Sequence, residues 1–141
     1  MFRSVSLILV SSLFSLVSFG ANYYYDWARG RDGSGYCYQF TSQGQVLNGG
    51  AAVDNELCEA VHPSRADWGQ NAQGFGYCYR FTPNNLILNR GQAIDNAQCE
   101  AVSPSHYQWG RGQDGWTYCY QFTAKGAVMN EGRPMPNEKC Y

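Results

Sequence analysis

Hydrophobic and polar residues alternate strictly over 36–41, where three aromatic side chains would share one face of a strand and a cysteine would lie on the other. Polar turn residues follow at 42–45, and an apolar pair at 46–47 begins a returning strand. The same series recurs at 77–88 and at 118–129. The pattern therefore predicts three β-hairpins.

Each hairpin is followed by an Asn-x-Gly turn and a short apolar stretch, which begins a third strand at 52–53 in the first copy. Residues 27–29 would supply a fourth strand. In an alternative interpretation, Asp54 and Asp95 cap one helical turn that runs to the next cysteine.

The chain matches itself at a period of 41 residues, which brings Trp27, Trp68 and Trp109 into coincidence. Each unit also has two cysteines separated by 21 positions. The units span 21–61, 62–102 and 103–141, and prolines interrupt the joins between them. We expect a single domain of three repeats over residues 21–141.

Residues 1–20 have the pattern of a signal peptide. Arg3 precedes an uncharged apolar stretch from Val5 to Phe19, and small residues stand before a cleavage point at Ala21. A span of the bilayer needs about 20 apolar residues, which is more than this stretch offers. We therefore expect a secreted, periplasmic or extracellular protein with no membrane span after cleavage.

The composition from Ala21 onward is that of a β domain stabilised by aromatic packing and disulfides. It contains only eleven Leu, Ile and Val residues, against nineteen aromatic residues and fifteen glycines. Nine Lys and Arg against eleven Asp and Glu leave a net charge of −2. A nearly neutral chain without a basic run is not expected to bind nucleic acid or an anionic membrane surface.

Six cysteines allow fifteen pairings, but repeated units are closed most simply within themselves. This predicts the disulfides Cys37–Cys58, Cys78–Cys99 and Cys119–Cys140, each worth roughly 3 kcal/mol for a loop of about 22 residues. There is no Cys-x-x-Cys pair, and the two histidines, His62 and His106, stand in the joins. We expect neither a metal site nor another cofactor.

The aromatic face of a single small sheet would be exposed, so the three units must cover one another. The expected fold class is all-β, with three disulfide-closed repeats in a β-trefoil-like closed domain of pseudo-three-fold symmetry. The alternative is a linear array of small β-hairpin units.

The segments Gly35-Tyr36-Cys37 and Asn48-Gly49-Gly50-Ala51-Ala52-Val53, followed by Cys58 and Trp68, resemble the repeat of ricin-type β-trefoil lectins. The resemblance covers all three units from Gly35 onward. It implies a sugar site beside the first cysteine and the segment before the second. The residues at these places are Gln39, Asp54, Asn55, Arg80, Asp95, Asn96, Gln121 and Asn137. The aspartate and the stacking aromatic of that family are absent from the corresponding positions.

Two aromatic residues are candidate ligand contacts on independent grounds. Phe75 and Trp116 occupy a Gly-flanked loop in which the first unit has Ser34, so this position does not require a core residue. The repeated tryptophans at 27, 68 and 109 are instead interpreted as core residues.

Catalysis is not expected, because the histidines lie in joins and the repeated acidic positions are lost in the third unit as Pro136 and Tyr141. Three similar units favour multivalent binding. The sequence thus predicts a secreted, non-catalytic, lectin-like module for surface glycans or cell-wall polysaccharide. The alternative is a structural or protein-binding envelope component with a cell-surface protein as partner, or an inhibitor of a secreted enzyme.

Overall fold

The computed structural model describes residues 22–141, so the expected signal peptide at 1–20 lies outside the described residues. Each unit is built on one antiparallel pair of strands. The strands are β1 (Tyr23–Arg29), β2 (Gly35–Thr41), β3 (Arg65–Gln70), β4 (Gly76–Phe81), β5 (His106–Arg111) and β6 (Thr117–Phe122). They pair as β1 with β2, β3 with β4 and β5 with β6.

The hairpin in each unit differs from the expected one. The strand over 36–41 is confirmed as β2, but its main partner is the preceding strand β1 rather than residues 46–47. The returning segment contributes only the isolated bridge Phe40↔Val46, and the expected third strand only the bridge Cys37↔Val53. The tight turn between β1 and β2 explains the preference, since Gly33 has φ +84° and the Asp32 carboxylate accepts the Ser34 amide at 2.9 Å.

Short helices complete the units, and the alternative expectation of a capped helical turn is confirmed. They are η1 (Asn48–Gly50), α1 (Asn55–Glu59), η2 (Asn89–Gly91), α2 (Asn96–Val102), η3 (Asn130–Gly132) and η4 (Asn137–Cys140). Asp54 caps α1 and Asp95 caps α2 through their side chains. In the third unit Pro136 replaces this aspartate and provides no side-chain cap, and the last turn is 3₁₀.

All three expected disulfides are present, with Cα–Cα distances of 5.7, 5.7 and 5.8 Å. Each ties its hairpin to the helix that follows. A tryptophan pairs across the hairpin with the first cysteine, as Trp27↔Cys37, Trp68↔Cys78 and Trp109↔Cys119. The disulfide and the tryptophan therefore form the centre of each unit.

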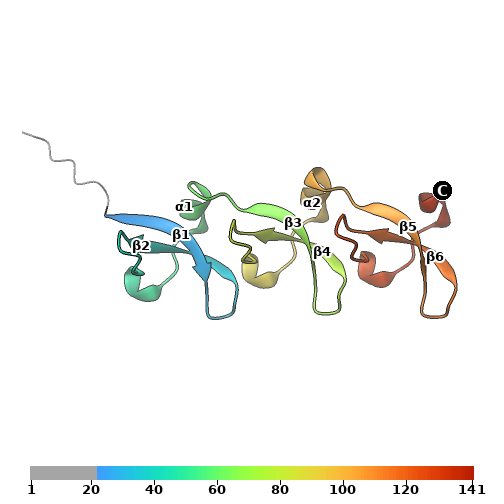
Figure 1. The fold of residues 1–141 in the computed structure, drawn as a ribbon, viewed down its shortest axis with the longest axis horizontal. Helices are drawn as coiled ribbons and strands as arrows, with labels where there is room; N and C mark the ends of the chain where they lie inside the picture. The colour runs from blue at the N-terminus through green and yellow to red at the C-terminus, as the bar shows by residue number, and fades with distance from the viewer. Residues whose placement is uncertain (1–21) are drawn as a thin grey trace, which may run out of the picture.

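The three hairpin units follow one another in a row along the long axis of the molecule (Figure 1). Their sheets remain separate two-stranded sheets, and residues 22–141 form no closed barrel. The expected β-trefoil-like closure is thus not confirmed, whereas the row has the arrangement of the alternative, a linear array. We refer to residues 22–61, 62–102 and 103–141 as units 1, 2 and 3.

Neighbouring units complete one another's cores. Leu88 of unit 2 packs with Trp27 and the Cys37–Cys58 disulfide of unit 1, and Met129 of unit 3 takes the same place beside Trp68 in unit 2. Backbone contacts repeat in step, because Gly35 N–H donates to the Ile87 carbonyl at 2.8 Å. Gly76 N–H donates to the Val128 carbonyl at the same distance. Units 1 and 2 therefore each depend on the next unit for a closed core.

Candidate functional site

A hollow lies at the junction of units 2 and 3. It has two adjoining parts of about 530 and 360 Å³, both lined by Phe75, Tyr120 and Gly132. Phe75 comes from the β3–β4 turn, Tyr120 from β6 and Gly132 from η3, so the site needs both units. The remaining lining residues are Gly110, Arg111, Gly112, Gln113, Asp114, Tyr118, Phe122, Val128, Glu131 and Pro134. We call this feature the junction groove.

Glycines allow the aromatic rings of the junction groove to lie directly on the backbone. A Cβ atom at Gly110 would approach the Tyr120 ring to 2.9 Å, and one at Gly112 would approach the Tyr118 ring to 2.8 Å. The Phe75 ring rests in the same way on Gly132, where a Cβ would lie 3.0 Å from Cε1. Any other residue at these glycines would displace the rings and change the shape of the groove.

Carboxylates stand at the rim of the junction groove. The Tyr118 hydroxyl donates to Asp114 Oδ2 at 2.6 Å, and the Trp116 backbone amide donates to Asp114 Oδ1 at 3.0 Å. These two hydrogen bonds lower the pKa of Asp114, and the bond from Tyr118 has the larger effect. The hydrogen bond between Tyr118 and Asp114 also raises the pKa of the Tyr118 hydroxyl. Asp114 is therefore ionised at neutral pH and keeps lone pairs that can accept bonds from a ligand.

A second carboxylate links the two units. The Tyr77 hydroxyl of unit 2 donates to Glu131 of unit 3 at 3.3 Å, and Glu131 also meets Arg133 at 3.1 Å. Desolvation and the Glu131 charge raise the pKa of Tyr77. Asp114 and Glu131 therefore both offer acceptor oxygens in the part of the groove that Phe75 also lines.

The residue at the tip of the hairpin turn differs between the units, whereas side-chain hydrogen bonds hold the turn in all three. Asp32 with Tyr36 and Asp114 with Tyr118 form the same 2.6 Å hydrogen bond. In unit 2 the Asn71 side chain takes over and accepts the amides of Gln73 and Phe75 at 3.0 and 2.9 Å. The residue at this turn position is Ser34 in unit 1, which is buried, and Phe75 in unit 2, which is half-buried. In unit 3 it is Trp116, whose surface is 72% exposed.

The structure places only one of the two aromatic candidates, Phe75, among the lining residues of the junction groove. Phe75 lines the junction groove, and Trp116 follows the rim residue Asp114 by two positions in the same loop. Trp27 and Trp68 are core residues, as expected, with exposed fractions of 3% and 1%. Trp109 differs from both, since it is 38% exposed.

The residues implied by the lectin resemblance are distributed over the scaffold of each unit. Gln39 accepts a bond from Asn48 at 3.0 Å, and Gln121 likewise accepts one from Asn130 at 3.0 Å and donates to Ser105 at 2.7 Å. Asp54 and Asp95 cap helices, Asn55 and Asn96 begin those helices, and Asn137 begins η4. Asn96 alone borders the unit 2–3 junction, in a smaller hollow of about 240 Å³ with Tyr77 and Glu131.

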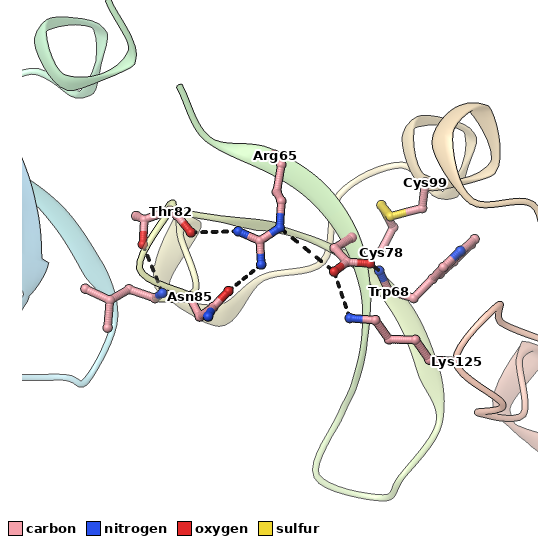
Figure 2. Close-up of polar contacts among 9 residues, drawn as sticks. Arg65, Trp68, Cys78, Thr82, Asn85, Cys99 and Lys125 are labelled. Carbon is pink, nitrogen blue, oxygen red and sulfur yellow. Dashed lines mark hydrogen bonds and ion pairs between the residues drawn. A yellow bond between two sulfur atoms is a disulfide. The ribbon is translucent and has the colours of Figure 1, made fainter. Parts of the chain in front are cut away.

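Arg80 belongs to a different hollow of about 650 Å³, which also contains Arg65, Asp67 and Gln98. Its guanidinium is engaged by Ser64 and Gln98, both at 3.0 Å. Figure 2 shows that Arg65 reaches the turn at Thr82 and Asn85, with Arg65 Nη1 donating to the Thr82 carbonyl at 2.9 Å. Lys125 of unit 3 approaches from the other side and pairs with Asp67 at 2.7 Å. These cations hold the scaffold together.

Sequence reasoning missed Tyr118, Tyr120, Glu131 and Gly132 as groove residues. The tyrosines belong to the alternating strand pattern, which was interpreted as packing. Variation between the units could have identified Glu131, because the aligned residues are Arg90 in unit 2 and Gly49 in unit 1, whereas many other positions of the repeat are identical.

No helix in residues 22–141 has the length and apolarity needed to cross a bilayer. Over the same residues, no cluster of three or more His, Cys, Asp or Glu side chains is arranged to hold a metal ion.

Comparison with protein-family models, with curated proteins and with solved structures gives no match for this chain. The interpretation of the junction groove therefore depends on its own geometry and chemistry.

Proposed function

We propose that the chain is an exported, non-catalytic binding module that holds an extended surface glycan or cell-wall polysaccharide. The observation that carries this proposal is the junction groove, where the aromatic rings of Phe75 and Tyr120 line the same hollow as the side chains of Asp114 and Glu131. Apolar ring faces stack on the faces of sugar rings, and carboxylates accept bonds from sugar hydroxyls. Export is consistent with three disulfides, which persist in oxidising compartments.

The arrangement of the aromatic side chains favours a polymer over a single sugar. Phe75 and Trp116 stand at equivalent turns of consecutive units, so one extended chain can follow the row and meet both. A single open sugar site has a Kd near the millimolar range, about −4 kcal/mol, and linked contacts along one polymer strengthen binding without new chemistry. We place binding on units 2 and 3, because unit 1 has a buried Ser34 at this turn.

The first experiment is a pull-down of the mature protein on insoluble cell-wall polysaccharides and whole envelopes, with monosaccharides as competitors. We expect retention on the polymer and little competition by single sugars. Phe75→Ala and Trp116→Ala should each weaken retention about tenfold, which corresponds to about 1.4 kcal/mol of binding free energy. Tyr23→Ala, which removes an exposed aromatic of unit 1, is the matched control and should bind as the parent does.

A second pair of variants tests the site implied by the lectin resemblance. Asp54→Ser and Asp95→Ser remove the carboxylates but keep side-chain oxygens that can cap α1 and α2, so the fold is retained. We expect these variants to bind normally. If they lose binding while Phe75→Ala and Trp116→Ala keep it, the ligand lies at the lectin-like position and the junction groove is the wrong site.

The same panel addresses the alternative function. If the parent binds no glycan or envelope polysaccharide, the glycan proposal is wrong, and the aromatic surface of units 2 and 3 would then serve contact with a protein.

A further inference from the structure

Within residues 22–141, the two ends of the row have uncovered faces that correspond to the two halves of its internal junctions. The face of unit 1 contains Thr41, Gln45, Val46 and Leu47, which align with the segment of units 2 and 3 that covers the preceding unit. The face of unit 3 contains Trp109 and Thr117, which align with residues that are covered in units 1 and 2. Val46 is 45% exposed and Trp109 is 38% exposed, so apolar surface remains at both ends. Head-to-tail docking of a second copy of the chain would use these two faces.

The covered side of each internal junction needs a glycine. At Gly35 a Cβ atom would lie 2.9 Å from the Leu86 Cβ and 3.1 Å from the Thr82 methyl group. At Gly76 it would collide with the Thr123 methyl group and lie 3.2 Å from the Ala127 Cβ. The aligned residue in unit 3 is Thr117, whose side chain would occupy this space.

The covering side of each junction needs an apolar residue. Leu86 and Ala127 are buried in the two internal junctions, and the aligned residue in unit 1 is Gln45, which is exposed. Burial of its amide against the apolar part of a second copy would leave polar atoms without partners. The Asp67–Lys125 pair also has no counterpart at the ends, since the aligned residues are Gln108 and Gln43.

We propose that Thr117 and Gln45 close the two ends of the row, so that copies of this chain do not join head to tail through the contact that joins units 1, 2 and 3. Repeat proteins require end units whose outer faces resist further stacking. Here the two end faces keep the backbone of the junction but replace the glycine and the apolar residue on which the contact depends. The contact that joins the units within the chain is thereby not repeated between copies of the chain.

The test restores the junction residues at both ends of the full mature chain. The parent should run as a single-chain species at all accessible concentrations in size-exclusion chromatography with light scattering. Gln45→Leu with Thr117→Gly should form species of two, three and more chains that grow with concentration. Adding Gln43→Lys and Gln108→Asp copies the Lys125–Asp67 pair and should shift this growth to lower concentration.

Gln45→Leu with Thr117→Ala is the matched control. It removes the threonine hydroxyl and methyl group but keeps a Cβ atom, so it should remain a single chain. Hydrogen exchange gives a local readout, because in the assembled variant the amide of residue 117 gains the Val46 carbonyl of the next copy as acceptor and becomes protected.

Three outcomes would overturn the proposal. These are assembly of the parent with protection at residue 117, assembly of the alanine control like that of the glycine variant, and a folded four-residue variant that stays a single chain. If the restored variants fail to fold, the reciprocal substitution Gly76→Thr is the deciding test. It should increase hydrogen exchange at residue 76 and weaken the contact between units 2 and 3. An unchanged junction would refute the proposal.

Discussion

At the junction of units 1 and 2, Leu88 closes a core around Trp27, whereas at the junction of units 2 and 3 Met129 closes a core around Trp68. Both junctions share the glycine, the 2.8 Å backbone bond and an indole bond to the following join, Trp27 to the His62 carbonyl at 2.7 Å and Trp68 to the Ser103 carbonyl at 2.6 Å.

Outside this frame the two junctions differ. The second has the Asp67–Lys125 pair, the Tyr77–Glu131 bond and Phe75 on Gly132, whereas the first has Asn84 near the Trp27 carbonyl at 3.4 Å. The shared contacts hold the units in a row, and the differences give the second junction its groove. We therefore expect residues that differ between the units to serve binding, and residues that the units share to stabilise the fold.

The largest expected effect concerns the tryptophans, which occupy equivalent positions in the three units but differ in how far they are exposed to solvent. Trp68→Ala should lower the free energy of unfolding by about 4 kcal/mol, because it empties a closed core. Trp109→Ala should cost less than half of that, since solvent already reaches 38% of its surface. Denaturant unfolding of the two oxidised variants measures the difference, and equal losses would mean that the next unit does not provide the cover.

The glycine of the junction comes next. Gly76→Thr should cost about 1–3 kcal/mol, because the new side chain meets Thr123 and Ala127 in a packed interface. Thr117→Gly should cost no more than about 1 kcal/mol, the ordinary loss for glycine in a strand, because nothing covers this position in residues 22–141. The measurement is again unfolding of the folded, oxidised proteins. A comparable loss at both positions would contradict the difference between covered and open faces.

Exchange of the two core residues should have a smaller effect. Leu88→Met with Met129→Leu keeps the volume of each core close to its original value, so the double variant should lose less than about 1.5 kcal/mol. Thermal unfolding is sufficient to show it. A larger loss would indicate that the two junctions differ in the shape of their cores as well as in their outer contacts.

The smallest effect concerns the ion pair that only the second junction has. Burial disfavours the charged carboxylate, but Lys125 and the Trp68 amide outweigh this and lower the pKa of Asp67 below its ordinary 3.8. A lowered folded pKa gives stability that is present above pH 3.8 and is lost as the pH falls through the folded value. Because Lys125 is 59% exposed, the pair should contribute less than about 1 kcal/mol.

A double-mutant cycle with Asp67→Asn and Lys125→Asn measures this coupling, at neutral pH and again in acid. The cycle is needed because Asp32 and Asp114 also have lowered pKa values and add to the acid dependence of the whole chain. Coupling that survives in acid would exclude an ionic origin.

The alternating pattern over 36–41 identified a strand and its faces correctly, but not its partner. Periodicity within one segment reports which side chains share a face, and both neighbours in the chain were close enough to pair. The turn at Asp32 and Gly33 decided in favour of β1, which pairs over all seven of its residues. The aspartate that caps α1 was recognisable as an alternative because capping is local, and for the same reason Pro136 removes the cap in unit 3.

Of the two aromatic candidates from the sequence, Phe75 lines the junction groove, whereas Trp116 lies outside its lining residues. Phe75 and Trp116 stood out because their position varies between units, and variation is visible in the sequence itself. Glu131 and Gly132 could not be assigned to the same groove, since they lie more than fifty residues from Phe75 and meet it only across the junction.

The period of 41 residues, the three disulfides and the central strand of each unit all follow from residue spacings along the linear chain. The choice between a ring and a row is made instead by the packing of whole units against one another. That choice depends on how the face of one unit meets the face of the next, where Gly35 bonds to Ile87 and Leu88 enters the core around Trp27. Repeated contacts of this kind set the position and orientation of each unit relative to the preceding one. That orientation depends on the shapes of two surfaces, and each surface is assembled only when the chain folds.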